Sequence, residues 1–230
     1  MRLTMLGTGN ANVTDYYNTC FLLTKETPEG PAHFLVDAGG GNRILKILKD
    51  VGVRMEDIHD LFVTHEHVDH ILGVIWLVRM IGQKINRGEY QGKLHIYCHK
   101  ELAEKIRAIA EMTIQKKVCR NFGERIIFEV VESGESRKIL GCDTTFFDIA
   151  STKAKQFGFT MRLPDGKKLT CVGDEPYREE ERAYVEGSDW LLHEAFCLYS
   201  EAERFKPYEK HHSTVKEACE LAESFGCALR

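Results

Sequence analysis

The chain has 230 residues, of which 43% are hydrophobic and 29% are charged. This composition is ordinary for a globular protein and excludes the disordered, collagen-like and membrane-spanning classes. With 31 basic and 35 acidic residues the net charge is −4, which excludes a protein held on nucleic acid by bulk positive charge.

The first part of the sequence predicts short strands that alternate with amphipathic helices. Strands are expected at residues 2–9, 18–24, 33–41, 60–65 and 93–99, where apolar runs end in glycines or histidines. Helices are expected at residues 42–52, about 70–83 and 101–112.

A second β-rich block follows, with consecutive strands and no helix between them. Its strands are expected at residues 125–131, 136–149, 157–163 and 168–174, and one more strand is expected at 189–196, after a helix. Helices are expected at residues 178–187 and 213–226, and the second begins at a T-x-x-E capping box formed by Thr214 and Glu217.

Two β-rich blocks, each followed by helices, predict an α+β fold in which two mixed sheets pack face to face with helices outside, an αββα sandwich. A doubly wound parallel sheet is the alternative, but consecutive strands without intervening helices at 2–39 and 125–174 disfavour it. We expect one domain over residues 1–230.

The eight cysteines form no C-x-x-C pair and most lie in apolar stretches, which predicts free thiols in a reducing compartment. The N-terminus lacks an apolar core of signal-peptide length, and the longest apolar run, residues 71–78, is far shorter than the ~20 residues of a membrane span. We therefore expect a cytoplasmic protein with no membrane partner.

The segment Thr64-His65-Glu66-His67-Val68-Asp69-His70 directly follows a predicted strand and carries the strongest chemical signal. In an extended segment His65 and His67 point to the same face and can reach one metal ion. If a helix begins next, Asp69 and His70 can reach a second ion. Imidazole and carboxylate ligands suit Zn²⁺, with Mn²⁺ or Fe²⁺ as alternatives.

This segment resembles the H-x-H-x-D-H signature of the metallo-β-lactamase fold. Asp37 in FLVDAGGG is similar to the aspartate of the family's first motif, and Asp174 in CVGDEPY to the carboxylate that bridges the two metal ions. The resemblance implies hydrolysis assisted by two divalent ions, with Asp69 also orienting the attacking water.

Two further motifs resemble the tRNase Z (ribonuclease Z) branch of that fold. They are His193-Glu194-Ala195-Phe196, similar to HEAT, and His212-Ser213-Thr214, similar to HST. The resemblance implies that Glu194 orients and polarises His212, which protonates the departing oxygen. A carboxylate-paired imidazolium is a suitable acid near neutral pH. The implied protein is a homodimer, as relatives often are.

The chain departs from the family pattern at two metal ligands. The expected histidine after the strand TTFFDI is replaced by Ala150, and no histidine lies between His99 and His193. The last ligand of the family is a histidine in the strand after the HST helix, and Cys227-Ala228-Leu229 resembles the first residues of that strand, so we expect a domain cut short at its C-terminus. Metal occupancy is therefore expected to be reduced, and the chain impaired as an enzyme.

The third departure concerns the substrate, because the arm that grips tRNA in long-substrate relatives is missing between Ala150 and Asp174. We therefore expect a small phosphodiester or nucleotide, such as a cyclic nucleotide or an RNA 3′ end, and not a long tRNA. A lactonase or thioesterase of the same fold, and a metal-depleted non-catalytic binding protein, stay open as alternatives.

Overall fold

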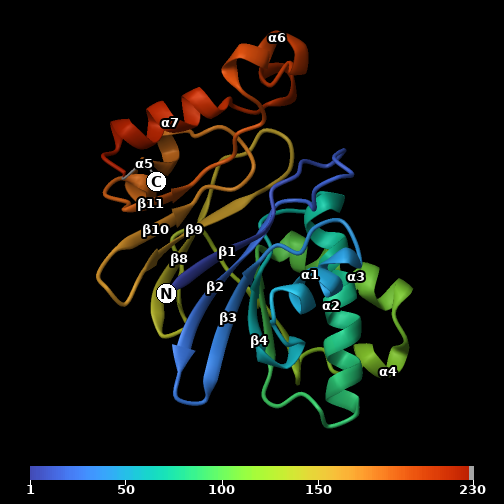
Figure 1. Cartoon of the computed structure of the whole chain (residues 1–230). Coiled ribbons are helices and arrows are strands. Elements are labelled where there is room, and N and C mark those ends of the chain that lie inside the picture. The colour runs from blue at the N-terminus through green and yellow to red at the C-terminus, as the bar shows by residue number, and fades with distance from the viewer. Residues whose placement is uncertain (228–230) are drawn as a thin grey trace. The chain divides into compact units, whose positions relative to one another are not determined.

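The computed structural model describes residues 1–227. They divide into two compact units, unit 1 (Met1–Val131) and unit 2, which begins at Glu132. Each unit contains one mixed β-sheet with its own helices (Figure 1). The predicted α+β class, with two mixed sheets flanked by helices, is confirmed. The strand expected from Cys227 lies, except for Cys227 itself, outside the described residues.

Unit 1 is built on a six-stranded sheet with the order β1-β2-β3-β4-β5-β6. Its strands are β1 (Arg2–Gly7), β2 (Cys20–Thr27), β3 (Gly30–Val36), β4 (Ile58–Phe62), β5 (Leu94–Cys98) and β6 (Ile126–Val130). The first three pair antiparallel, and β3 through β6 run parallel. The carboxyl ends of the parallel strands therefore meet at one edge, the usual place for a binding site in such sheets.

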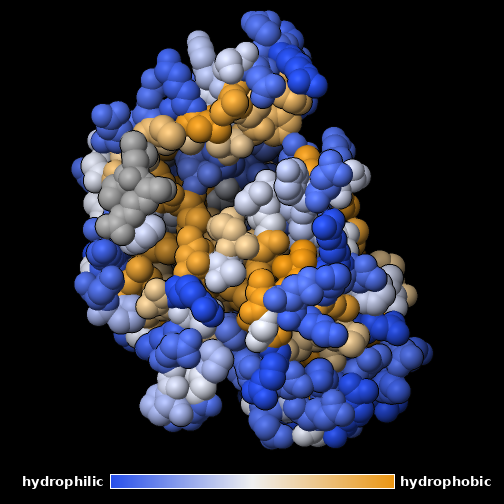
Figure 2. All heavy atoms as spheres, viewed as in Figure 1, coloured by the Kyte–Doolittle hydropathy of each residue, from blue (hydrophilic) through white to orange (hydrophobic). Residues whose placement is uncertain are grey.

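The helices of unit 1 connect the parallel strands. They are α1 (Arg43–Asp50), α2 (Val68–Asn86), α3 (Lys100–Thr113) and α4 (Lys116–Cys119), with a 3₁₀ turn at Met55–Asp57. Apolar side chains of α2 such as Val74, Leu77 and Val78 are fully buried in the core of the unit. Hydrophilic side chains predominate over the outer surface of the α3 and α4 region (Figure 2).

Helix α2 begins two residues earlier than predicted and continues to Asn86. His67 has an extended backbone and is the N-cap residue. Asp69 lies in the first turn, where a carboxylate is favoured by the helix dipole. The early start places the last three residues of the histidine motif on one helical turn.

Unit 2 contains a five-stranded sheet with the order β11-β10-β9-β8-β7. Its strands are β7 (Ser136–Ile139), β8 (Cys142–Asp148), β9 (Phe157–Arg162), β10 (Lys168–Cys171) and β11 (Trp190–Leu192). All pairs are antiparallel except β10 with β11.

The single strand predicted at 136–149 is wrong, because the chain reverses between β7 and β8. Leu140 and Gly141 both have positive φ, 52° and 73°, and Ile139 pairs directly with Cys142. This is the geometry of a two-residue type I′ hairpin turn. A leucine in the left-handed region is uncommon. Of the two turn residues, only Gly141 is of a type that indicates such a turn in a sequence.

The helices of unit 2 are short except for the last one. They are α5 (Arg182–Val185), α6 (Ala202–Phe205) and α7 (Val215–Ser224), with 3₁₀ turns at Glu179–Glu181, Tyr199–Glu201 and Tyr208–Lys210. The helix predicted at 178–187 is thus a 3₁₀ turn and one α-helical turn, which ends where Glu186 becomes extended. The capping box of Thr214 and Glu217 at the start of α7 is confirmed.

None of the helices in residues 1–227 combines the length and the apolar character needed to cross a membrane.

Candidate metal centre and acid–base pair

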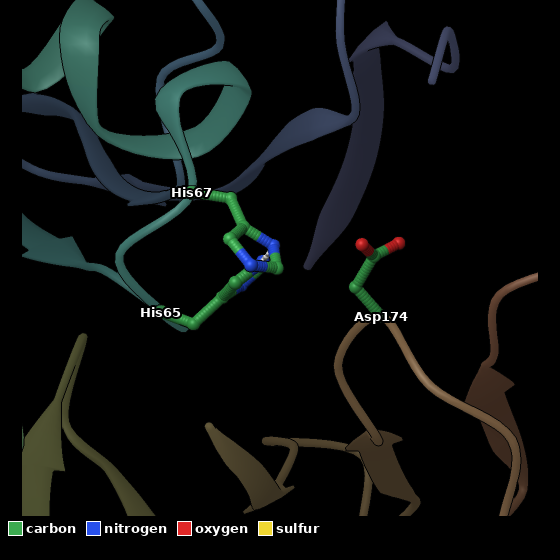
Figure 3. A group of neighbouring side chains, drawn as sticks. All are labelled: His65, His67 and Asp174. Carbon is green, nitrogen blue, oxygen red and sulfur yellow. Dashed lines mark hydrogen bonds between the residues drawn. The ribbon is translucent and has the colours of Figure 1, made fainter. Parts of the chain in front are cut away.

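His65 and His67 lie on the extended segment between β4 and α2 in unit 1. The Nε2 atom of His65 is 2.9 Å from the Nδ1 atom of His67, and the rings meet edge to face with centroids 4.5 Å apart. Figure 3 shows the two rings turned toward each other. The prediction that both side chains share one face is confirmed.

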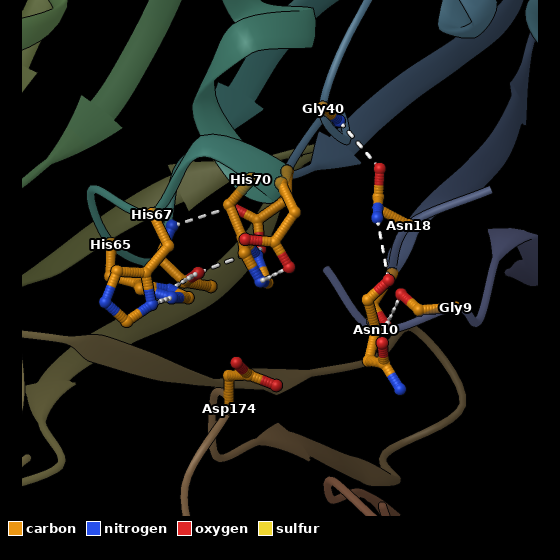
Figure 4. Close-up of polar contacts among 12 residues, drawn as sticks. Gly9, Asn10, Asn18, Gly40, His65, His67, His70 and Asp174 are labelled. Atoms are coloured by element: carbon orange, nitrogen blue, oxygen red, sulfur yellow. Dashed lines mark hydrogen bonds and ion pairs between the residues drawn. The ribbon is translucent and has the colours of Figure 1, made fainter. Parts of the chain in front are cut away.

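Asp69 and His70 extend this group from the first turn of α2. The His70 Nε2 atom is 3.6 Å from Asp69 Oδ2, and the rings of His65 and His70 have centroids 4.1 Å apart. Figure 4 shows the three histidines together, and with Asp69 all four ligand-type side chains of the motif gather after the carboxyl end of β4. Their roles as ligands stay a prediction.

The buried carboxylate of Asp37, directly after β3, fixes this group. Asp37 Oδ1 accepts the backbone N–H of Thr64 at 2.9 Å, and Oδ2 accepts the Thr64 hydroxyl at 2.8 Å and His70 Nδ1 at 2.8 Å. Because the Thr64 hydroxyl donates to Asp37, it accepts from His65 Nδ1 at 2.9 Å. Both His65 and His70 thus carry their proton on Nδ1, which puts the lone pair on Nε2.

This donor set fits a divalent metal ion. Two nitrogens that bind one tetrahedral Zn²⁺ at about 2.0–2.1 Å are roughly 3.3 Å apart, close to the 2.9 Å between His65 and His67. A histidine that donates its other ring proton to a carboxylate or hydroxyl is typical of zinc ligands. The neutral tautomers and the neighbouring Asp69 carboxylate are therefore what such an ion requires.

The loop after β3 packs tightly against this motif. The backbone N–H of Gly40 donates to Asn18 Oδ1 at 3.0 Å, and Asn18 Nδ2 donates to the Asn10 carbonyl at 3.0 Å (Figure 4). A Cβ atom at Gly40 would lie 2.9 Å from Asn18 Oδ1 and 3.4 Å from the Asp69 Cα. Glycine at this position lets the loop approach the start of α2.

Asp174 lies in unit 2, on the loop that follows β10 (Figures 3 and 4). Its backbone N–H donates to Gln156 Oε1 at 2.7 Å. The preceding Gly173 has φ +77°, and a Cβ atom there would lie 2.7 Å from the same oxygen. Glycine is therefore required at position 173 by the local backbone and by Gln156. The metal-bridging role of Asp174 stays a prediction.

Ala150 follows β8, where the family places a histidine. Its side chain is exposed and its φ is +55°. The next two residues are tied to the buried Glu175, because Ser151 Oγ donates to Glu175 Oε1 at 2.6 Å and the Thr152 N–H to Oε2 at 3.2 Å. Within unit 2 the segment of Ala150 is therefore joined to the residue next to Asp174, but a methyl group offers no ligand.

Glu194 and His212 meet in unit 2, as the HEAF and HST motifs predict. Glu194 Oε2 is 3.2 Å from His212 Nδ1. Glu194 Oε1 accepts the backbone N–H and the hydroxyl of Ser213, both at 2.6 Å. The His212 ring stacks on Phe196 at an interplanar angle of 8°. The carboxylate is thus fully engaged in orienting one imidazole.

The neighbouring His193 has a different, structural environment. Burial lowers the pKa of His193, so the ring is neutral near pH 7. Its Nδ1 donates to the Glu194 carbonyl at 2.6 Å, and its Nε2 accepts the Tyr177 N–H at 3.2 Å. His193 therefore ties the loop after β10 to the strand end that carries Glu194.

Sequence reasoning missed several residues that shape these sites. Thr64 directly precedes His65 and Glu175 directly follows Asp174. This adjacency was the only feature of the sequence that could have indicated their supporting roles. It also missed a cavity of about 270 Å³ in unit 2 that has His212 in its wall, together with Tyr177, Arg178, Tyr208 and His211. No spacing pattern in the sequence connects 175–178 with 208–212.

Comparisons with known proteins show what this chain is similar to. A ribonuclease Z of Microcystis aeruginosa is 24% identical over 96% of this chain and 80% of its own length. An exodeoxyribonuclease WalJ of Streptococcus pneumoniae is 41% identical over 70% of this chain and 53% of its own length. The structure of the short form of human tRNase Z matches with a TM-score of 0.76 at 20% identity, over 98% of this chain and 88% of that chain.

The chain therefore has the metallo-β-lactamase fold and is ribonuclease Z-like. The predicted class, a metal-dependent hydrolase, is confirmed by these relatives. A family model described as "Anti-Pycsar protein Apyc1" matches residues 1–225. Because that match spans nearly all of the sequence, the chain belongs to the anti-Pycsar Apyc1 family.

Proposed function

We propose that this chain hydrolyses a P–O bond in a small phosphodiester, such as a cyclic nucleotide or an RNA 3′ end, with two divalent metal ions. His65 and His67 would hold one ion. Asp69 and His70 would hold the other, and Asp174 would lie between them. The ions, Zn²⁺ or alternatively Mn²⁺ or Fe²⁺, would supply positive charge to the phosphate and lower the pKa of a water molecule.

The observation that carries this proposal is the pair of Glu194 and His212. Cleavage of an alkyl P–O bond expels an alkoxide, which needs a proton in the transition state. Glu194 faces His212 Nδ1 at 3.2 Å, so it would hold the ring by the Nδ1 side and leave the Nε2 side to donate toward the departing oxygen. A lactonase or thioesterase has no such requirement, which places that alternative second.

The side chains of unit 1 would act on the attacking water. The Asp69 carboxylate is only partly exposed and lies beside His70 Nε2, where it would accept a proton from that water and orient it. Glu194 and Asp69 would then play opposite parts, because one holds a proton donor in place and the other receives a proton.

Ala150 is expected to weaken the binding of the first of the two ions, because alanine supplies no ligand atom. The residues after Ala150 are anchored to Glu175 beside Asp174, so the backbone is in place and only the ligand is missing. The reduced occupancy expected from the sequence remains part of the proposal. A non-catalytic binding protein is the alternative that Ala150 favours.

A leaving-group comparison tests the proposal. Three substrates are compared. The leaving group of bis-p-nitrophenyl phosphate needs little protonation, whereas that of a 3′,5′-cyclic nucleotide is an alkoxide; a lactone is the third substrate. His212→Asn should lower kcat/KM about 10²–10⁴-fold for the cyclic nucleotide and less than about tenfold for the nitrophenyl ester. The control is His95→Gln, a partly exposed histidine paired with Glu129.

Two results would contradict the proposal. One is an equal loss on both phosphodiesters, which would show that His212 does not protonate the leaving group. The other is a faster reaction with the lactone than with either phosphodiester, even with Ala150→His in place, which would favour the lactonase.

The substrate is proposed to be small because no arm interrupts unit 2 between Ala150 and Asp174. That interval consists of a short loop at 151–156, β9, a short turn, β10 and the first residues of the next loop. The chain has no extension there that could reach the elbow of a tRNA, so long tRNA is left out of the proposal.

A homodimer is also part of the proposal. Val68, Leu72 and Trp76 are exposed by 61%, 36% and 38%, and their i, i+4, i+8 spacing puts them on one face of α2. A second copy of the chain would cover this apolar stripe beside the histidine motif. Light scattering should give a dimer mass for the wild type and a monomer mass for Trp76→Glu; a monomeric wild type would refute the dimer.

A cytoplasmic location completes the proposal. All eight cysteines are free thiols in the structure, and five of them are buried, as expected for a chain that folds in a reducing compartment.

A further inference from the structure

Asp174, the carboxylate proposed to lie between the two ions, is attached to unit 2 by groups that the proposed chemistry does not use. It lies on the loop after β10 and is itself only partly buried. Two polar side chains that hold this loop, Gln156 and Glu175, are each only 1% exposed. Polar side chains are seldom buried to this degree, and those that are buried make particular hydrogen bonds.

Gln156 contacts Asp174 from a neighbouring segment. It directly precedes β9, and its backbone carbonyl accepts the Ile149 N–H at 3.1 Å, which closes the loop between β8 and β9. The side chain serves a different part of the chain, because Oε1 accepts the backbone N–H of Asp174 at 2.7 Å. The amide of Gln156 therefore supports the loop after β10 and not the hairpin to which the residue belongs.

Gly173 leaves room for this hydrogen bond. A Cβ atom at position 173 would lie 2.7 Å from Gln156 Oε1 and 3.2 Å from Ile149 Cδ1. The φ of +77° is also one that glycine adopts without strain. A side chain at position 173 would therefore displace the amide oxygen from the Asp174 N–H.

Glu175 holds the residue on the other side of Asp174. Its carboxylate accepts the Ser151 hydroxyl at 2.6 Å and the Thr152 N–H at 3.2 Å. The Arg178 guanidinium lies 4.0 Å from the same carboxylate. The main chain of Asp174 is thus fixed at its own N–H and again at the next side chain.

A fixed main chain has a specific use for a carboxylate that binds metal ions. A ligand atom must be held within about 0.5 Å of the productive position. Groups that orient a ligand without binding the ion themselves typically account for about 10–100-fold in metal affinity. A glutamine can provide this support as a neutral hydrogen-bond acceptor, so it adds no negative charge beside the ligand.

We propose that Gln156 is a positioning residue for the Asp174 carboxylate, with Glu175 fixing the residue that follows. This inference rests on the proposed function, because it takes Asp174 to be a metal ligand. It deepens that function by assigning part of the metal affinity to a buried amide that acts through the main chain of Asp174.

A double-mutant cycle in zinc affinity tests the inference without turnover. The Zn²⁺ affinity of the full chain is measured by competition with a chromophoric chelator. Gln156→Leu, which removes the acceptor, should lower this affinity about 10–100-fold. In the Asp174→Ala background the same substitution should cause no further loss, because no carboxylate is left to position.

Two more variants separate positioning from a general loss of stability. Gln156→Glu keeps an acceptor oxygen in either protonation state and should retain most of the wild-type affinity. The matched control is Thr170→Val, because the buried Thr170 hydroxyl contacts Ser188 Oγ at 2.7 Å and Thr160 Oγ1 at 3.1 Å in the same unit. This control should lower the melting temperature and leave the zinc affinity unchanged.

Four results would overturn the inference. They are wild-type zinc affinity in Gln156→Leu, wild-type affinity in Asp174→Ala, an equal effect of Gln156→Leu with and without the Asp174 carboxylate, and an equal loss of affinity in Thr170→Val. The third result would show that Gln156 contributes only to the stability of unit 2.

The outcome is distinct from that of the leaving-group comparison. Hydrolysis of phosphodiesters as proposed, with a zinc affinity that does not depend on Gln156, would remove the inference and leave the proposed function standing. A zinc affinity that depends on Gln156 through Asp174, without hydrolysis of any phosphodiester, would support the positioning role and remove the proposed activity.

Discussion

Glu181 is the buried carboxyl group with the largest predicted effect on stability. Its side chain is fully buried. Its Oε1 accepts the Arg178 N–H at 2.9 Å, while Oε2 has no hydrogen-bond partner within residues 1–227. Burial raises the pKa of Glu181 from an ordinary 4.5 to about 8. The folded chain therefore keeps Glu181 protonated at neutral pH, whereas the unfolded chain ionises it.

The sign of the pH dependence follows from linkage. Because the unfolded state binds fewer protons between pH 4.5 and pH 8, the free energy of unfolding falls as pH rises through that window and levels off above it. At about 1.4 kcal/mol per factor of ten in proton affinity, the loss between pH 5 and pH 8.5 is about 4 kcal/mol. Glu181→Gln keeps an acceptor for Arg178 but cannot ionise, so this loss should disappear.

Urea unfolding of the full chain with a chelator present, from pH 5 to pH 8.5, measures the effect. The free energy of unfolding of Glu181→Gln, relative to that of the wild type, should increase by about 4 kcal/mol across this range. The adjacent and exposed Glu180 supplies the control Glu180→Gln, which should track the wild type. Parallel pH profiles for wild type and Glu181→Gln would refute the reasoning.

Three further predictions concern the metal centre and its support. Ala150→His should increase Zn²⁺ affinity in calorimetric titration, because histidine tolerates the φ of +55° and adds the missing ligand; unchanged affinity would count against the alignment. Asp37→Asn should lower zinc affinity about 10–100-fold, and equal affinity would show that Asp37 does not orient the histidines. Gly73→Ala would place a Cβ atom 1.8 Å from the Ala38 carbonyl, so unfolding should become easier by at least about 2 kcal/mol. Gly41→Ala meets open space and should leave the melting temperature nearly unchanged, whereas equal shifts in both variants would refute the steric argument.

Periodicity was sufficient to predict most strands and long helices. The parallel strands of unit 1 are continuous buried runs, and the T-x-x-E box at Thr214 fixed the start of α7. The hairpin at Leu140 was missed because its first turn residue is not one that favours positive φ. The short helical turns between 199 and 210 were missed because segments of three or four residues carry no period.

The candidate sites divide in the same way. Alternation placed His65 and His67 on one face, and the family motifs predicted the contact between Glu194 and His212. The cavity wall could not be predicted, because Tyr177 and Tyr208 come from segments thirty residues apart that meet only through the fold. The burial of Glu181 could not be predicted either, because glutamates in a charged stretch are normally exposed to water.

The hydrogen bonds of Asp37 have a consequence for the protein without metal. The end of β3, the end of β4 and the first turn of α2 are joined through one carboxylate, so the imidazoles are already preorganised before an ion arrives. In zinc fingers, by contrast, the metal supplies the folding free energy. Removal of metal ions with a chelator should therefore abolish hydrolytic activity and leave the circular dichroism spectrum unchanged. Adding the ions back should restore activity without refolding.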